Sequence, residues 1–302
     1  MIKAEIVHDS KINTSEVIKY KKEKFIVLAW KRMRKNKPAM VGLLVILIFA
    51  LLAIFADSIA GYEEVALKQD YTQKLMSPSK EHILGTDALG RDIFARMIHG
   101  TRLSLSLGFV IVGIALFFGI LFGGISAFYG GVIDMIIMRV LDLFMSIPPM
   151  LLMLSLVTAL GAGIDKLVIA IIVVMVPGYT RVIRAAMLSV STNEYIEAAK
   201  ASGCSDLKIV FRHMLPNSIG PILVVSTLSI ASTIVMISGF SFLGVGVSAP
   251  QPEWGAMLAE ARQYMRYSPY LMIVPGTALL LVSLSFNLIG DGIRDALDPK
   301  VK

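Results

Sequence analysis

The chain contains a single cysteine, Cys204, among its 302 residues. One thiol excludes an internal disulfide and a metal site built from several cysteines. The four histidines are scattered, and the sequence contains no His-Glu-x-x-His, Gly-x-x-x-x-Gly-Lys-Ser/Thr or Gly-x-Ser-x-Gly motif. These absences argue against a zinc protease, a P-loop ATPase and a serine hydrolase. A membrane-embedded enzyme would also need a catalytic constellation that the sequence does not offer.

Charged residues are scarce, at 17% of the chain, whereas soluble domains average about 25%. Hydrophobic residues make up 56% of the sequence, and the mean hydropathy is +0.73. The apolar residues form runs close to the roughly 20 residues that cross a bilayer as a helix. The runs are continuous rather than alternating, so they predict helices and not a barrel. We therefore expect an all-α integral membrane protein with six transmembrane helices, near residues 40–56, 103–128, 143–160, 167–182, 219–247 and 270–289.

The net charge of +7 is concentrated before the first apolar run, where nine lysines and arginines lie between Lys19 and Lys37. The positive-inside rule places this stretch in the cytoplasm. Six spans return the C-terminus to the same side. No basic face carries interleaved aromatic residues, which argues against nucleic-acid binding. The expected organisation is a basic cytoplasmic tail (1–37) with an interfacial helix (16–30) near lipid headgroups, a first span (38–56), an extracytoplasmic segment (57–100), a five-helix core (101–292) and a cytoplasmic tail (293–302).

A polar segment at residues 190–217 interrupts the apolar runs and falls on the predicted cytoplasmic side. Ser191 to Glu194 form a capping-box pattern that predicts a helix start, and Gly203 suits a left-handed helix stop. Pro216 breaks the chain again before the next span. Small residues leave a helix surface that another protein can approach closely, although an ordinary loop helix would also fit. The candidate contact residues are Glu194, Glu197, Ala198, Ala199, Gly203, Leu215 and Pro216.

Two charged residues lie at the start of the third predicted span. Arg139 and Asp142 are three positions apart, so they share a helix face and can form an ion pair at the membrane boundary. Such a pair would serve either packing or gating. The Pro148-Pro149 pair then predicts a kink or restart of the helix.

The predicted outer segments carry glycines and charges in a compact pattern. Two glycines permit tight backbone turns there, and the neighbouring charges can pair with one another. By themselves these residues predict a structured loop, a lip with satisfied ion pairs. The outer-face residues are Gly85, Thr86, Asp87, Gly90, Arg91, Asp92, Trp254 and Gly255.

The fifth predicted span is rich in small hydroxyl residues. Such a helix either lines a polar path or packs tightly, with its hydroxyls bonded to its own carbonyls. The candidate pathway residues are Ser232, Thr233, Ser238 and Ser241, together with Asn287 in the sixth span.

The polar segment resembles the EAA loop of bacterial binding-protein-dependent ABC importers, through Glu197-Ala198-Ala199, Gly203 and Leu215-Pro216. His213 departs from the pattern, which usually has isoleucine there. Further motifs are similar to those of the dipeptide/oligopeptide/nickel permeases and indicate the C-type subunit: Leu84-Gly85-Thr86-Asp87, Gly90-Arg91-Asp92, Gly100-Thr101-Arg102-Leu103-Ser104-Leu105, Tyr129-Gly130-Gly131, Asp134, Met138-Arg139, Asp142, Pro148, Pro252-x-Trp254-Gly255 and residues 290–299.

The resemblance implies a type I ABC importer fold in the cytoplasmic membrane of a bacterium or archaeon. It implies a B-type permease partner, one or two ATPases that bind ATP and Mg, and an extracytoplasmic solute-binding protein. The lip of outer-face residues would then either contact this binding protein or, more in keeping with paired charges, brace the mouth of the pathway. This chain would itself bind no cofactor and hydrolyse no ATP. The helix at 194–202 would dock on an ATPase and transmit its closure, so that the permease pair alternates between inward- and outward-facing states.

The expected substrate is a di- or oligopeptide. Nickel or another small solute remains an alternative, although the spans hold no convergent His or Cys ligands. An ion-coupled secondary transporter is the other alternative. The carboxylates lie at the ends of the predicted helices rather than paired in mid-membrane, and no inverted repeat is evident, which argues against that class.

Overall fold

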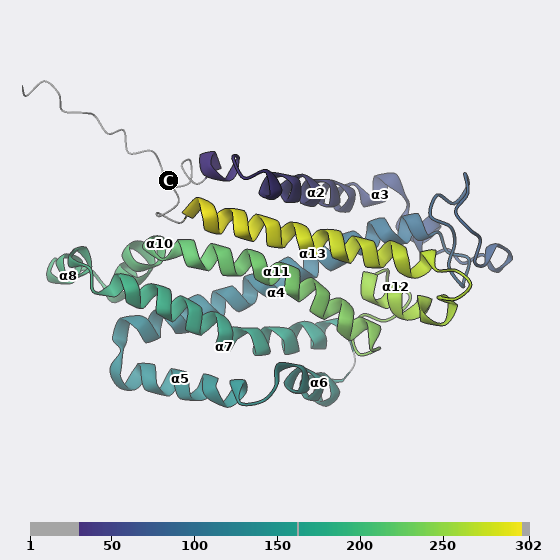
Figure 1. Cartoon of the computed structure of the whole chain (residues 1–302). Coiled ribbons are helices and arrows are strands. Elements are labelled where there is room, and N and C mark those ends of the chain that lie inside the picture. Colours follow the sequence, from purple (N-terminus) through teal and green to yellow (C-terminus); the bar gives the residue numbers. More distant parts are fainter. Residues whose placement is uncertain (1–29, 162, 298–302) are drawn as a thin grey trace, which may run out of the picture.

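The computed structural model describes residues 30–161 and 163–297 (Figure 1). Within these ranges the regular elements are all helices, which confirms the all-α prediction. The predicted interfacial helix lies, except for Trp30, outside the described residues, as do positions 298–302 of the predicted C-terminal tail. In the described part of the chain, five single helices are long and apolar enough to cross a membrane: α2 (Lys37–Ile54), α4 (Ile93–Tyr129), α7 (Ile164–Ser191), α11 (Ile219–Phe242) and α13 (Tyr270–Leu297).

The third predicted span differs from a single straight helix. Its residues belong to α5 (Gly131–Met145) and α6 (Pro149–Leu160), which are bent by 84° relative to each other. The bend falls at Pro148 and Pro149, since proline lacks the N–H that would continue the helical ladder and restricts the residue before it. The predicted kink is therefore confirmed, while the helix preceding it begins at Gly131, well before the predicted start.

The long helices pack side by side in a bundle (Figure 1). α4 runs along α7, and α13 contacts both α11 and α2. Gly119 and Gly123 of α4 allow the close approach to α7: a Cβ on Gly119 would lie 2.7 Å from Tyr179 Cβ, and one on Gly123 would lie 2.9 Å from the Thr180 carbonyl oxygen. Small residues bring membrane helices together because lipid supplies no hydrophobic drive for their association.

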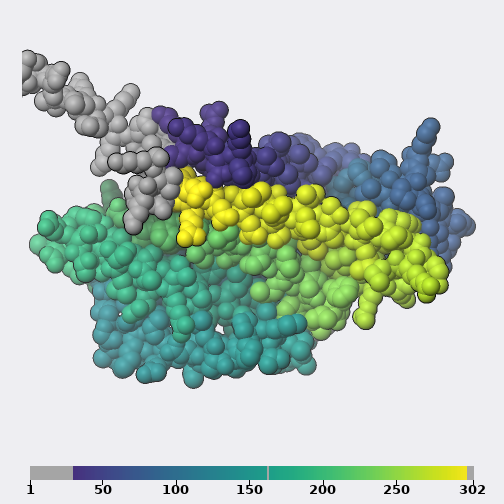
Figure 2. Space-filling view, in the orientation of Figure 1, coloured from purple at the N-terminus to yellow at the C-terminus, as the bar shows by residue number. Residues whose placement is uncertain are grey.

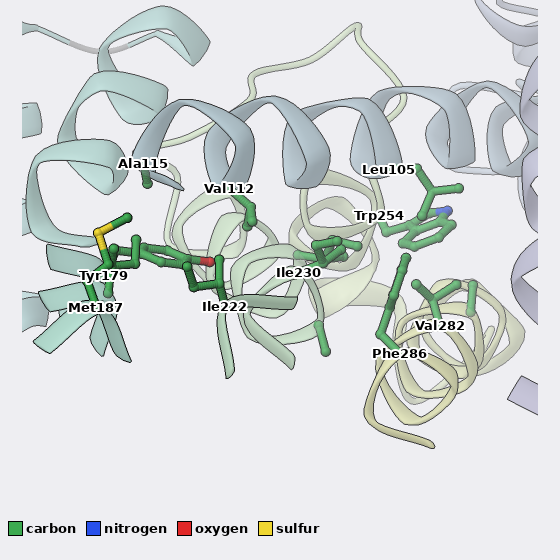
Figure 3. Packing of buried hydrophobic residues seen from close by; sticks show 14 of the residues in the cluster. Leu105, Val112, Ala115, Tyr179, Met187, Ile222, Ile230, Trp254, Val282 and Phe286 are labelled. Carbon is green, nitrogen blue, oxygen red and sulfur yellow. The ribbon is translucent and has the colours of Figure 1, made fainter. Parts of the chain in front are cut away.

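The core between these helices is apolar (Figure 3). Trp254 is fully buried and meets Phe49 of α2 edge to face, with ring centroids 5.8 Å apart. Leu105, Ile230 and Phe286 bring α4, α11 and α13 into the same cluster. Trp254 of the short helix α12 (Trp254–Ala261) thus packs at the junction of the spans.

The two ends of the bundle carry different short elements. At one end lie the start of α2, the end of α13 and the helix α8 (Glu194–Ala201); at the other lie α3 (Ala56–Ile59) and α12 (Trp254–Ala261) (Figure 1). The Asn36 side chain caps α2 by accepting from Ala39 N at 3.1 Å, and its Nδ2 donates to Asp295 Oδ2 at 3.1 Å. The beginning of α2 is therefore fixed to the last turn of α13.

Candidate functional site: the helix at one end and the charged lip at the other

The helix α8 projects beyond the bundle at one end (Figure 2). It begins at Glu194 with Asn193 as the N-cap residue, whose side chain makes no capping hydrogen bond. Ser191 instead ends α7, and its hydroxyl donates to Leu188 O at 2.9 Å. The predicted capping box at Ser191 is therefore wrong, because α7 continues past the apolar run and uses these residues for its own last turn.

Gly203 terminates α8 as the sequence predicts. Its φ is +72°, in the left-handed region that favours glycine. Gly203 N donates to Lys200 O at 3.0 Å, and Cys204 N donates to Ala199 O at 3.1 Å. These two bonds form a Schellman motif, which satisfies the last carbonyls of the helix and sets the direction in which the chain leaves it.

The chain returns from α8 to the bundle through three short helical pieces: α9 (Asp206–Lys208), η3 (Ile209–Met214), which is π-helical, and α10 (Leu215–Asn217). Ile209 and Met214 are buried against the core, and Pro216 lies in the first turn of α10. The Ser218 hydroxyl donates to Met214 O at 2.9 Å or to Ala186 O at 3.2 Å. The segment therefore packs against the bundle and hydrogen-bonds to α7.

One side of this segment is packed and the other is open. Ile196 and Ala199 are buried, whereas Glu194, Glu197 and Ala198 are exposed. Large apolar side chains of the segment are also exposed: Tyr195 of α8, Leu207 of α9 and Phe211 of η3 are 42%, 70% and 48% exposed. Apolar side chains gathered among charges on a projecting element are typical of a protein contact surface.

Contacts with α4 hold the segment in place. Lys200 Nζ lies 5.1 Å from the centroid of the Phe128 ring, and Tyr129 Oη donates to Asp206 Oδ2 at 2.9 Å. Both aromatic residues belong to the last turn of α4, so α8 and α9 each contact the end of that helix.

The predicted Arg139–Asp142 pair is replaced by a different one. Asp142 accepts a hydrogen bond from Arg181 Nη2 of α7 rather than from Arg139 on its own helix. A second arginine of α7, Arg184, binds Asp134 of α5. The ion pairs therefore join α5 to α7 instead of stabilising α5 alone.

At the opposite end, a cluster of four charged side chains joins the outer segments. Asp87 accepts from Arg91 Nε and from Arg96 Nη1, each at 2.6 Å. Glu260 of α12 accepts from Arg91 Nη2 at 2.5 Å and from Arg96 Nη1 at 2.8 Å. Asp87, Arg91 and Arg96 are buried. Two arginines and two carboxylates thus neutralise one another and tie α12 to the start of α4.

The sequence reasoning missed Arg96 and Glu260. Glu253 and Glu260 are the two acidic residues of the outer segment 248–269. They could have been proposed as partners for Arg91. Long-range pairing of this kind is not set by local spacing, so the specific contacts came only from the structure.

The turn around this cluster is built as the glycines predict. Gly85 and Gly90 have φ of +81° and +75°, and a Cβ on Gly90 would lie 1.7 Å from Asp70 O. Asp70 itself caps the short turn Tyr71–Gln73, and hydrogen bonds from the Thr72 hydroxyl and then from its N–H lower the pKa of the Asp70 carboxyl.

Two further predicted residues complete the turn. Thr86 Oγ1 accepts from Met76 N at 2.9 Å. Asp92 caps α4 by accepting from Ala95 N at 2.9 Å, and its other oxygen lies 2.8 Å from His82 Nδ1. Both side chains therefore hold backbone in place, which is a bracing arrangement.

Glu253, which the sequence reasoning did not single out, fixes α12. Its carboxylate is buried and accepts from Gly255 N and Ala256 N, each at 2.9 Å, and from Ser238 Oγ at 2.8 Å. A negative charge at a helix N-terminus is favoured by the helix dipole. Gly255 is needed at this contact, because a Cβ there would lie 2.1 Å from Ser238 O.

The predicted pathway residues divide into two groups. Thr233, Ser238 and Ser241 are buried within the chain, and Ser241 Oγ accepts from Val247 N at 3.1 Å. These three are packing residues, so their prediction as pathway lining is wrong. Ser232 and Asn287 are exposed and remain candidates.

Comparison with known proteins gives the chain its family. Residues 103–302 match the binding-protein-dependent transport system inner membrane component, and residues 24–78 match the N-terminal TM domain of oligopeptide transport permease C. The dipeptide transport system permease protein DppC of Alkalihalophilus pseudofirmus is 45% identical over 276 residues, covering 91% of this chain and 90% of that protein.

Other relatives have similar coverage. DppC of Haemophilus influenzae is 40% identical, over 90% of this chain and 94% of its own length. The glutathione transport system permease protein GsiD of Escherichia coli is also 40% identical, over 90% of both. A solved chain of the inward-facing MetNI methionine ABC transporter shares the fold, with a TM-score of 0.55 and 18% identity, over 67% of this chain and 97% of that one.

These matches agree with the predicted type I importer fold and with the motifs that carried the resemblance. As a permease, the chain works with ATPase and binding-protein partners rather than as an enzyme. This chain belongs to the binding-protein-dependent transport system inner membrane components and is a multi-pass permease subunit of a bacterial ABC importer.

Proposed function

We propose that this chain is the C-type permease of a peptide importer and forms half of a translocation pathway for di- or oligopeptides. The observation that carries the substrate class is its 40–45% identity, over about nine tenths of its length, to permeases named for dipeptides and glutathione. Nickel remains the alternative substrate to be tested beside peptide.

In this proposal a B-type permease supplies the other half of the pathway. One or two ATPases bind ATP and Mg, and an extracytoplasmic protein delivers the peptide. Both termini and α8 are cytoplasmic, because lysines and arginines are concentrated in the sequence before α2, between Lys19 and Lys37, and the positive-inside rule assigns such a stretch to the cytoplasm. The exposed side of α8, which carries Tyr195, receives the ATPase together with the exposed Leu207 of α9 and Phe211 of η3.

The mechanism follows from how α8 is held. α8 ends in a Schellman motif at Gly203, Lys200 of α8 contacts Phe128 and Asp206 of α9 contacts Tyr129, so movement of this segment reaches the last turn of α4. ATP shifts the equilibrium between inward- and outward-facing states only through contacts that differ between them. We assign those differing contacts to the exposed side of α8 and its ATPase groove.

The test is uptake into vesicles that contain the full-length chain with a B-type permease, the ATPases and the binding protein. Labelled Ala-Ala should accumulate only with ATP, should persist when an ionophore collapses the proton gradient, and should exceed Ni²⁺ uptake. Uptake without ATP that stops with the ionophore would indicate an ion-coupled transporter instead.

A further inference from the structure

A cavity of about 420 Å³, which carries a few charged and polar side chains on a mainly apolar wall, opens at the end of the bundle opposite α8, away from the charged cluster around Arg91. It is lined by Asp57 of α3, Tyr62 of the next helical turn, Arg102 and Ser106 of α4, and Gln251 from the loop before α12. Its volume lies within the range of small-molecule sites in proteins, about 300–1,000 Å³.

The cavity presents one positive and one negative side chain. Arg102 Nη1 donates to Asp57 Oδ2 at 2.8 Å, and the two side chains are 52% and 62% exposed. An exposed pair of this kind adds little stability, so a ligand that replaces each partner can open it at low cost. This distinguishes it from Arg91, which is buried between two carboxylates.

The wall behind this pair is fixed. His99 is buried, its Nε2 lies 2.7 Å from Ala60 O, and its ring meets Tyr62 edge to face with centroids 5.0 Å apart. Ser106 follows Arg102 by four positions, so both lie on the same exposed face of α4. The site therefore combines a hydrogen-bonded, packed wall with two exposed charged side chains.

We propose that this cavity binds the zwitterionic backbone of a short peptide as it enters the permease. Arg102 pairs with the peptide's α-carboxylate, and Asp57 pairs with its α-ammonium. The Gln251 amide and the Ser106 hydroxyl line the same cavity and can hydrogen-bond the peptide bond. The terminal charges of an extended dipeptide are separated by at most about 7 Å. This inference rests on the proposed peptide function. A phosphatidylethanolamine headgroup carries the same pair of charges, and the experiment below separates the two sources.

The experiment measures protection of a thiol placed in the cavity. The full-length chain carries Leu103→Cys, at a lining position with no assigned part in binding, in a Cys204→Ser background and is held in vesicles of phosphatidylcholine and phosphatidylglycerol. Ala-Ala at about ten times its Kd should slow maleimide modification about tenfold, by simple occupancy. N-acetyl-Ala-Ala-amide, which has neither charge, should not slow it. A matched thiol from Ser77→Cys, elsewhere in the outer segment, should react equally with and without peptide.

Charge-removing variants give the second readout. Asp57→Asn and Arg102→Gln should each require about tenfold more Ala-Ala for the same protection, the equivalent of about 1.4 kcal/mol. Glu63→Gln removes an exposed carboxylate outside the cavity. This variant should need the same concentration of Ala-Ala for protection as the parent chain.

Three results would overturn the proposal: no protection by Ala-Ala, equal protection by the blocked peptide, or protection that appears only when phosphatidylethanolamine is added. If Ala-Ala gives no protection while the complete system takes it up with ATP, the cavity proposal fails and the peptide function stands. If the complete system takes up no peptide, the peptide function itself fails.

Discussion

Arg184 of α7 donates two hydrogen bonds to the carboxylate of Asp134 in α5, from Nε to Oδ1 at 2.6 Å and from Nη2 to Oδ2 at 2.5 Å. The Ser126 hydroxyl of α4 donates to the same carboxylate. The Arg184 and Asp134 side chains are only 30% and 20% exposed. Three helices therefore meet at one carboxylate, near the end of the bundle that carries α8.

The first prediction concerns this pair. Asp134→Asn and Arg184→Gln should each destabilise the chain, and a double-mutant cycle should give a coupling energy of about 1–3 kcal/mol, typical of contacting charged residues. The measurement is denaturant unfolding of the chain in detergent. The exposed pair Lys166–Asp165 is the control and should give less than about 1 kcal/mol. Equal coupling at both sites would mean that the Asp134 pair adds no more than a surface contact.

The second prediction concerns the contact of α12 with α11. Gly255→Ala should lower the free energy of unfolding by about 1–3 kcal/mol, because the added methyl group meets Ser238 O and forces the helices apart. Gly113→Ala is the control, since no atom lies within 4 Å of its added Cβ. That change should be neutral or stabilising by up to about 1 kcal/mol. A neutral Gly255→Ala would show that α12 is not packed against α11 in this way.

The third prediction concerns the stop of α8. Gly203→Val should reduce substrate-stimulated ATP hydrolysis by the assembled importer, because a left-handed backbone costs a β-branched residue about 1–2 kcal/mol and re-aims the helix. Gly203→Asn tolerates that conformation better and should retain most of the stimulation. Normal stimulation in Gly203→Val, with the ATPases still bound, would leave the segment a mere connector.

The fourth prediction concerns the outer cluster. Arg91→Glu would place a third carboxylate beside Asp87 and Glu260 and leave buried charge uncompensated, so it should destabilise the chain by about 3–5 kcal/mol. The measurement is the yield of folded, assembled permease. Arg262→Glu, an exposed arginine next to α12, should assemble normally. Normal assembly of Arg91→Glu with lost binding-protein association would favour docking over bracing.

Apolar run length predicted six spans, because the bilayer fixes how many residues a helix needs to cross it. Five of them correspond to single helices of the described chain, and the third corresponds to the bent pair α5 and α6. It could not give their ends. α4 begins at Ile93, ahead of the predicted start at residue 103, because the Asp92 cap and not the apolar run determines where that helix begins. α7 likewise extends to Ser191, past the predicted end at residue 182.

The sequence also predicted the positions at which the backbone needs a conformation that favours glycine. Gly85, Gly90 and Gly203 have the positive φ that their surroundings predict. Side-chain partners were not readable, because they depend on which helices become neighbours. Asp142 therefore pairs with Arg181 rather than with the closer residue in sequence, and the Ser238 hydroxyl bonds a buried Glu253 instead of lining a pathway.

The most direct test of the account is a photo-cross-link from α8 to the ATPase in the assembled importer. A benzophenone amino acid replaces Tyr195, which is 42% exposed on α8, and in a matched control replaces Tyr267, which is 81% exposed at the opposite end. Illumination should give a covalent adduct with the ATPase from position 195 and none from position 267. An ATPase adduct from position 267, or none from position 195 in an importer that still transports, would contradict the assignment of α8 as the coupling helix.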